Sequence, residues 1–448
     1  MELISEYFVK PNHKFDDLKD RLYLKPLDLC MLAIHPIQKG LLYTLNNNTI
    51  TPNTIPNLLN NLRHSLSIAL VHFYPLAGRL STETFYEEHT ATCVLFIDCN
   101  KGEGAKIIHA GTKNISISDI LYSGHVPGIV QKFYDFGEEY INYDCHTRPL
   151  LSVQVTELVD GVFLGFSMCH SVVDGTSFMH FISILSEIFC SNLSLDISRV
   201  PIFDHGVVLK LPYIGLDNIM IRHEIARLTD RIFHFSSESI WALKAKAHKK
   251  CGTKNVNISS FQALASLVWK SITRARNLSA EQETSCCLII NARPRLDPPK
   301  SDQYFGNYVS QVKVICKVGE LLGHELGWAA SRLNEGIKAK NSASIRGVWA
   351  GFGDQITTVG FPSPGADVHG PNNVVIGGST RFDMYGPEFG LGKAIGVLMG
   401  FGNKDDGKVT ANPSCEGGSS VDLEISLQHK YMTVLQLDQD FMKFVTLN

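Results

Sequence analysis

Residues 161–189 read GVFLGFSMCHSVVDGTSFMHFISILSEIF, and this stretch decides the fold class. The run 161–168 is short and apolar, which is typical of a buried strand. After Asp174-Gly175, apolar residues recur at helical spacing over 178–188, and Thr176 and Ser177 are good helix N-caps. The stretch therefore predicts a strand, a turn and a helix, with His170 where the strand ends. Loops in such positions on a rigid scaffold often carry catalytic groups.

His170 and Asp174 are separated by three residues, and the context of this motif matters more than its spacing. The same spacing occurs at His13 and Asp17, in a polar segment without other signs of a site. Strand alternation puts Cys169 on the opposite face from His170, so a cysteine–histidine dyad is geometrically unfavourable. Taken alone, the motif favours a buried histidine with a satisfied hydrogen bond, and only the rest of the chain supports a catalytic interpretation.

The composition indicates a globular protein of two domains. A chain of 448 residues is too long for one ordinary core. The net charge of −3 gives no electrostatic case for binding nucleic acid. The N-terminus lacks a signal peptide's apolar core, and no stretch approaches transmembrane length, so we expect no membrane association. The eleven cysteines include no CxxC pair, which predicts reduced, buried thiols in a cytosolic protein. We further expect a monomer.

We predict a first domain over 1–190, a crossover loop over 191–218 and a second domain over 219–448. The crossover contains prolines and has no clean period. A segment near 388–412 is a candidate for packing with the first domain. We predict three further helices: one over 62–73, one that starts at Ser237 and one that Ser260 caps. We also predict strands over 231–235 and 285–291, and a Gly/Pro-rich surface loop over 360–378.

Several blocks resemble the plant BAHD acyltransferases, a family marked by an HxxxD site and a later DFGWG loop. The resemblance covers nearly the whole chain, and the blocks occur in the family's order. They are HPIQKGLL at 35–42, FYPLAGRL at 73–80, His170 with Asp174, SSFQAL at 259–264, NARPRL at 291–296, YFGN at 304–307 and GGSSVD at 417–422. The loop block departs from the pattern, because this chain has Glu388-Phe389-Gly390-Leu391-Gly392.

The resemblance implies an α/β (α+β) fold of two chloramphenicol-acetyltransferase-like domains with an active-site channel between them. It implies acyl transfer from acyl-CoA, used as a co-substrate, to a hydroxyl or amine of a small molecule. His170 would be the general base, since imidazole titrates near neutral pH. No enzyme nucleophile, metal or permanently bound cofactor is needed, because CoA thiolate is a good leaving group.

For Asp174 two interpretations are open. It either orients His170 as in a catalytic triad or pairs with an arginine of the second domain and holds the domains in register. The resemblance favours the second, with Arg293 as the first choice and Arg295 as the second. A carboxylate buried between domains needs such a partner.

The remaining candidate site residues follow from the resemblance. Phe389, Gly390, Leu391 and Gly392 form the active-site loop, and Ser379 and Thr380 are oxyanion candidates. Ser259 and Ser260 at a helix N-terminus, together with Lys393, are candidates for binding the CoA phosphates. A capping serine and a surface lysine explain these residues equally well. Leu391 removes an indole N–H, which either loses an oxyanion donor, reflects a reshaped pocket or is drift in a glycine loop.

The sequence therefore predicts a CoA-dependent acyltransferase of plant specialised metabolism. One rival is a lyase with the BAHD fold that uses no CoA and cleaves an isochorismoyl-glutamate-type conjugate in salicylate formation. The HPIQKGLL block resembles the subgroup that contains this lyase, and such a reaction would not need the missing indole. A second rival is a non-catalytic binding protein, against which the intact His170 and Asp174 argue.

Overall fold

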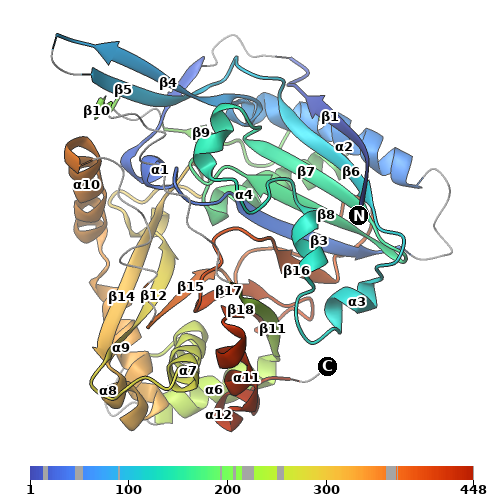
Figure 1. Cartoon of the computed structure of the whole chain (residues 1–448). Coiled ribbons are helices and arrows are strands. Elements are labelled where there is room, and N and C mark those ends of the chain that lie inside the picture. Colours follow the sequence, from blue (N-terminus) through green and yellow to red (C-terminus); the bar gives the residue numbers. More distant parts are fainter. Residues whose placement is uncertain are drawn as a thin grey trace.

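The computed structural model describes residues 1–13, 19–45, 54–88, 91–191, 194–204, 208–213, 227–249, 257–359, 370 and 372–446. Two six-stranded sheets organise these residues into two domains of mixed α/β structure (Figure 1). The first domain, coloured blue to green, lies above the second, coloured yellow to red, in that view. The predicted α/β class is confirmed.

The first sheet has the strand order β1-β6-β7-β8-β3-β16, and all neighbours are antiparallel except β6 and β7. Helices α2 and α4 share an apolar core with one face of this sheet. The other face packs against α3 and the 3-10 helix η2. The strands are β1 Glu2–Val9, β3 Ile37–Thr44, β6 Ala105–Gly111, β7 Leu151–Glu157, β8 Gly161–Met168 and β16 Gly396–Met399. The helices are α1 Pro26–Cys30, α2 Thr54–His72, α3 Ile117–Leu121, α4 Gly175–Cys190, η1 Tyr74–Ala77, η2 Gly128–Phe133 and η3 Asn142–His146.

The unit β8–turn–α4 forms as its apolar pattern predicts. Every residue of β8 is buried. The predicted inward-facing residues of α4 are all buried, namely Phe178, Phe181, Ile182, Leu185 and Ile188. The predicted N-cap is wrong, because α4 begins at Gly175 and Asp174 caps it. Asp174 Oδ1 accepts the backbone N–H of Ser177 at 2.9 Å, so the carboxylate takes the capping role expected of Thr176 or Ser177.

The second sheet has the strand order β11-β18-β17-β15-β12-β14, with β15 parallel to both β12 and β17. Helices α6, α7, α9 and α11 pack on one face. The strands are β11 Thr229–Phe235, β12 Glu283–Asn291, β14 Val309–Lys317, β15 Asn373–Gly378, β17 Lys408–Pro413 and β18 Val421–Leu427. The helices are α6 Ser237–Lys249, α7 Ser260–Ala275, η4 Arg293–Arg295, α8 Val318–Gly323, α9 Leu326–Ala339, α10 Ser342–Val359, α11 His429–Leu437 and α12 Gln439–Met442.

The face of the second sheet without these helices is directed toward the first domain. Val409 and Ala411 of β17 belong to the helix-covered core, so Lys408, Thr410 and Asn412 point the other way. The Lys39 ammonium of β3 donates to Asn412 Oδ1 at 3.1 Å, which joins the two sheets across the junction.

Chain segments cross between the two domains. Strand β16 comes from the second half of the chain, yet it pairs with β3 at the edge of the first sheet. Its neighbour β17 belongs to the second sheet, so the segment 388–412 is divided between the domains. The described part of the crossover, 194–204 and 208–213, pairs with both sides. Strand β9 Ile202–Phe203 pairs with β13 Tyr304–Phe305. Strand β10 Leu211–Pro212 pairs with β5 Ala91–Asp98, which also pairs with β2 Arg21–Tyr23 and β4 Arg79–Tyr86.

Several local predictions are corrected by long-range packing. The predicted surface loop 360–378 contains strand β15, whose apolar residues are buried between β12 and β17; positions 360–369 and 371 lie outside the described residues. Helix α2 begins at Thr54 rather than at Leu62. The sequence pattern missed the first half of the helix because that half buries only a narrow apolar stripe. Helix α7 is capped by Ser259, not Ser260. All described cysteines are free thiols, but Cys190 and Cys415 are exposed, because Cys190 ends α4 and Cys415 lies in the turn between β17 and β18.

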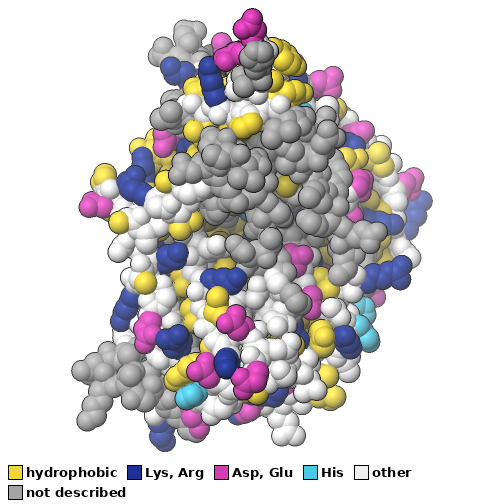
Figure 2. Space-filling view, turned by 60° about the vertical axis from the view of Figure 1, so that its left-hand side comes forward, with side chains coloured by type: hydrophobic (Ala, Val, Ile, Leu, Met, Phe, Trp, Pro, Cys, Tyr) yellow, Lys and Arg dark blue, Asp and Glu magenta, His cyan; other side chains and the backbone are white. Residues whose placement is uncertain are grey.

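The surface seen in Figure 2 has no extended patch of one charge among the described residues. Lysine and arginine side chains alternate there with aspartate and glutamate. Within the described part of the chain, no helix is both long and apolar enough to cross a membrane.

Candidate active site

Asp174 and Arg293 form a fully buried ion pair between the two domains. Arg293 Nη1 donates to Asp174 Oδ2 at 2.7 Å, and Nη2 donates to Oδ1 at 3.2 Å. The backbone N–H groups of Ser177 and Tyr308 also donate to this carboxylate, both at 2.9 Å. Both oxygens of Asp174 are therefore committed, and none of the described hydrogen bonds joins them to His170. The geometry favours the register interpretation of Asp174 over a catalytic dyad.

Arg293 extends this pair into the second domain. Its Nη2 also donates to Ser177 Oγ and to the carbonyl oxygens of Tyr304 and Gly306, at 2.9–3.0 Å. The alternative Arg295 lies elsewhere and donates to the carbonyls of Ile337 and Lys340. A guanidinium with all these acceptors satisfies the desolvated charge, as a buried ion pair requires.

The backbone of His170 is held on both sides by buried asparagines that the sequence did not single out. His170 N–H donates to Asn142 Oδ1 at 2.7 Å. The His170 carbonyl accepts from Asn307 Nδ2 at 2.7 Å. Asn142 comes from η3 of the first domain and Asn307 from the second, so both domains contribute to the position of the histidine. Only the YFGN block offered a signal, since it ends in Asn307.

Asn307 connects His170 to a buried carboxylate. The same Nδ2 donates to Asp28 Oδ1 at 3.0 Å, and Lys25 N–H donates to Asp28 Oδ2 at 3.0 Å. Burial raises the pKa of Asp28. This chain from α1 through Asn307 fixes the carbonyl of His170, and the Asn307 side chain also raises the pKa of the ring.

The imidazole of His170 has one buried and one available nitrogen. Nδ1 is buried, while Nε2 takes part in none of the described hydrogen bonds. Burial lowers the pKa of His170; its own carbonyl and Asp174 act in the opposite direction, and Lys408 lowers it further. Nδ1 has no hydrogen-bond partner among the described residues, so no described contact fixes which ring nitrogen carries the proton of the neutral form. The lowered pKa favours the neutral form of the ring.

The loop 388–392 packs onto the first domain. Phe389 is buried against Phe166 of β8 and Phe189 of α4, with ring centroids 6.0 and 5.8 Å apart. Phe389, Gly390 and Gly392 have φ angles of 47°, 69° and 80°, so the loop turns sharply through left-handed backbone. Leu391 is half-buried against the same core. The aromatic anchor keeps the loop in place although the tryptophan is missing.

The other candidate residues are less closely connected to His170. Ser379 Oγ accepts from the Arg381 N–H at 3.2 Å, and Ser379 and Thr380 are half-buried after β15. Ser259 Oγ accepts from Gln262 N–H as the cap of α7. None of the described hydrogen bonds or ion pairs joins these residues, Ser260 or Lys393 to the histidine. Their assigned roles stay predictions.

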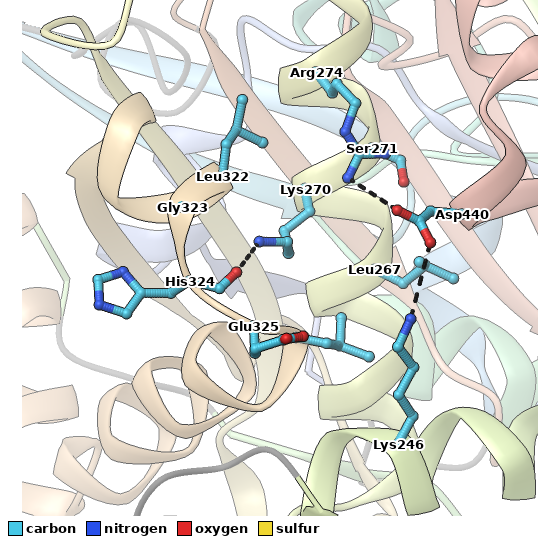
Figure 3. Close-up of a pocket in the computed structure, with 11 residues that line it drawn as sticks. Lys246, Leu267, Lys270, Ser271, Arg274, Leu322, Gly323, His324, Glu325 and Asp440 are labelled. Atoms are coloured by element: carbon cyan, nitrogen blue, oxygen red, sulfur yellow. Dashed lines mark hydrogen bonds and ion pairs between the residues drawn. The ribbon is translucent and has the colours of Figure 1, made fainter.

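A cavity among helices of the second domain is not part of this site. It has a volume of about 250 Å³ and is lined by residues of α6, α7, α8, α9 and α12 (Figure 3). The Lys270 ammonium donates there to the carbonyls of Leu321 and His324. Arg274 pairs with Asp438 and lies 3.8 Å from Asp440. These contacts fix both cations at the cavity.

Comparisons with known proteins extend over nearly the whole chain. The Transferase family profile matches residues 1–442. An uncharacterized acetyltransferase of Arabidopsis thaliana is 31% identical, over 98% of this chain and 98% of that protein. BAHD acyltransferase DCR of the same plant is 28% identical, over 99% and 92%.

A solved structure shows the same fold. TRI101 of F. graminearum, complexed with coenzyme A and T-2 mycotoxin, has a TM-score of 0.76 and 19% identity, covering 95% of this chain and 99% of that one. The family resemblance carried by the HxxxD motif and the other blocks is confirmed by these matches. The chain belongs to the BAHD family of acyltransferases and is an enzyme of that class.

Proposed function

We propose that the protein is a CoA-dependent acyltransferase that moves an acyl group from a thioester to a hydroxyl or amine of a small molecule. The observation that carries this proposal is the state of His170. Its backbone is fixed from both domains, its Nδ1 is buried and its pKa is lowered. Such a neutral imidazole with a free Nε2 suits a general base.

In the proposed reaction, His170 Nε2 takes the proton of the acceptor as its oxygen or nitrogen attacks the thioester carbonyl carbon. A new C–O or C–N bond forms and the C–S bond then breaks. The departing CoA thiolate takes the proton back from the imidazolium, so the enzyme returns to its starting state. Asp174 and Arg293 hold the domains in register and do not touch the reacting atoms.

The use of CoA is supported by the family and by the fold. The matching TRI101 structure contains coenzyme A together with a small-molecule acceptor, and relatives of this chain are named hydroxycinnamoyltransferases. We propose Ser259, Ser260 and Lys393 as contacts of the CoA phosphates, and Ser379 or Thr380 as oxyanion donors. We also propose that the enzyme is a cytosolic monomer in plant specialised metabolism.

The test is a thiol-release assay with acetyl-CoA and p-coumaroyl-CoA against a panel of alcohols and amines. We expect His170→Ala to lower turnover by about 100- to 10,000-fold, the cost of losing a general base, while the fold stays intact. His125→Ala, at an exposed histidine, is the matched control. Near wild-type turnover in His170→Ala would overturn the assignment of the base.

The lyase stays a second candidate because of Leu391. A reaction without a thioester tetrahedral intermediate would not need an oxyanion donor at this position. Calorimetry with acetyl-CoA distinguishes the two candidates. We expect binding; absence of binding, together with an intact fold, would favour the lyase.

A further inference from the structure

We propose that the cavity among helices α6, α7, α8, α9 and α12 is a binding site for a small organic monocarboxylate with an apolar body. The cavity has a volume of about 250 Å³ (Figure 3). A water molecule occupies about 30 Å³ in the liquid, so the cavity has room for a molecule of roughly eight to ten non-hydrogen atoms. This is a second site, and it does not depend on the proposed acyl transfer.

The second sheet lies between this cavity and the first domain, to which His170 belongs. Leu267 and Leu326, which line the cavity, are part of the core that the helices form on one face of the sheet. The opposite face is directed toward the first domain. In Figure 1, helices α6, α7, α8 and α12 lie at the end of the molecule away from that domain. A ligand in the cavity would therefore leave the proposed acyl-transfer site open.

The N-terminus of α9 lies at the cavity. This helix has 14 residues, and its N-cap Glu325 makes no side-chain cap hydrogen bond. The cavity wall at this end consists of Gly323, His324, Glu325 and Leu326. The N–H groups of a first helical turn carry a partial positive charge and bind anions. The helix end therefore adds a favourable field for a negatively charged ligand.

Ser271 adds a polar group whose hydrogen-bonding capacity is unused. Its side chain is fully buried and lines the cavity. Ser271 Oγ has no hydrogen-bond partner among the described residues. Buried hydroxyls are otherwise hydrogen-bonded in proteins, because the desolvation of an unpaired polar group is costly. A hydroxyl can donate to a carboxylate oxygen, so a ligand in the cavity would satisfy it.

Lys270 is a buried cation whose hydrogen-bond partners are neutral. Its ammonium donates to the carbonyl oxygens of Leu321 and His324 at the end of α8. An ammonium has three N–H donors, so one is left, and none of the described ion pairs involves this group. Burial lowers the pKa of Lys270 to about 8. A bound anion would stabilise the charged form of the side chain.

The charged groups around the cavity leave one positive charge in excess. Three cations line it against two carboxylates, namely Lys246, Lys270 and Arg274 against Glu325 and Asp440. The further described ion-pair partners of these groups are one acid, Asp438, and one base, Lys443, which balance each other. One negative charge would neutralise the site, whereas a phosphate dianion would exceed its positive charge. The charge balance therefore favours a monocarboxylate.

A single carboxylate is shared among several of these cations. Asp440 accepts from Lys443 at 2.7 Å and lies 3.9 Å from the Lys246 ammonium and 3.8 Å from the Arg274 guanidinium. Among the described residues, no other carboxylate forms an ion pair with Lys246. Burial and the neighbouring Lys443 lower the pKa of Lys246. Its charge is thus compensated only in part, and Figure 3 shows its side chain directed toward Asp440 at the cavity.

Leucine side chains give the cavity an apolar wall beside its charged end. They are Leu267, Leu322 and Leu326. Small-molecule sites commonly combine such apolar surface with a few polar groups that fix the orientation of the ligand. The carboxylate of the ligand would contact the cations, and its hydrocarbon or aromatic body would cover the leucines. A benzoate-sized acid satisfies both requirements and the volume.

Ligand-detected NMR titration at pH 7 on the full-length protein tests the site with benzoate and its neutral counterpart benzamide. We expect benzoate to bind with a Kd of about 1 mM or below, and benzamide, acetate and inorganic phosphate to bind more weakly. Lys270→Met should weaken benzoate binding about 10- to 100-fold, with little effect on benzamide. Ser271→Ala should weaken it about 2- to 10-fold. Lys249→Met, at an exposed lysine of α6 outside the cavity, is the control.

The outcomes separate this inference from its rivals. Equal binding of benzoate and benzamide by the wild type, or tighter binding of inorganic phosphate than of benzoate, would overturn it. Because Lys270 also holds the end of α8, Lys246→Met is a further variant that leaves this end intact, with an expected loss of about 2- to 5-fold. Wild-type benzoate affinity in both Ser271→Ala and Lys246→Met would refute the site. A loss in His170→Ala without a loss in the cavity variants would assign benzoate to the catalytic site and also overturn the inference.

Discussion

At the scale of single residues, the site depends on buried polar groups with few alternatives. Asn142 and Asn307 fix the backbone of His170, and burial lowers the pKa of its ring. A misplacement of a base by about 1 Å can cost about 100-fold in rate. The asparagines are therefore positioning residues, and their removal should affect chemistry rather than CoA binding.

Asn307→Ala should lower kcat about 10- to 100-fold, with little change in KM for the acyl-CoA. The variant removes the Asn307 amide group, which donates both to the His170 carbonyl and to Asp28. Steady-state kinetics at several pH values measures the effect. Because the side-chain hydrogen bond of Asn307 raises the His170 pKa, its loss should also move the acidic limb of the pH–rate profile to lower pH. A change confined to the melting temperature would reduce Asn307 to a structural role.

The pH dependence of turnover should reflect the lowered pKa of His170. Only the neutral imidazole can act as base, so activity should fall as pH drops through the folded pKa, which lies below the ordinary value of about 6.5. Lys408 contributes to this lowering, so Lys408→Met should shift the acidic limb toward higher pH. Asp174 acts in the opposite direction and is unchanged in this variant. A limb that moves to lower pH in kcat/KM profiles would contradict this electrostatic account.

At the scale of elements, one turn connects a strand, a helix and the other domain. Asp174 caps α4 and at the same time accepts the guanidinium of Arg293 from η4. The start of the helix and the register of the domains thus depend on a single carboxylate. The loop 388–392 adds a second connection, because Phe389 packs between β8 and α4.

Asp174→Ala should lower the free energy of unfolding by about 3–5 kcal/mol, since it leaves Arg293 buried without its counter-charge. Thermal and denaturant unfolding measure this loss, and activity should fall with it. Ser116→Ala, at the exposed cap of α3, is the control and should cost only about 1 kcal/mol. An unchanged melting temperature with lost activity would instead support a His170–Asp174 dyad.

At the scale of the whole molecule, the domains share structure and are not simply joined. Strand β16 completes the first sheet with residues from the second half of the chain, and Lys39 reaches Asn412 across the junction. Folding of the first domain therefore depends on a segment that lies more than 200 residues after its last helix along the sequence. We expect the two domains to unfold together.

Leu398→Ala in β16 tests this coupling. Leu398 is fully buried and its carbonyl accepts the Tyr134 hydroxyl at 2.8 Å. The variant should cost about 2–5 kcal/mol and shift a single calorimetric transition to lower temperature. Leu3→Ala, at an exposed position of β1 in the same sheet, should change little. Two separated transitions would show that the domains unfold independently.

The sequence by itself determined what depends on neighbouring residues and on ordered blocks. The apolar run 161–168 and the helical spacing after it predict β8 and α4, and the blocks around His170, Asp174 and Arg293 indicate the family, because these patterns are local. The tertiary structure decided the rest. Partners far along the chain determine three features: the choice of Asp174 as the cap of α4, the formation of strand β15 where a loop was expected, and the position of β16 in the first sheet. Asn142 has no local signal, because a buried amide gains its role only when the fold brings it to the backbone of His170.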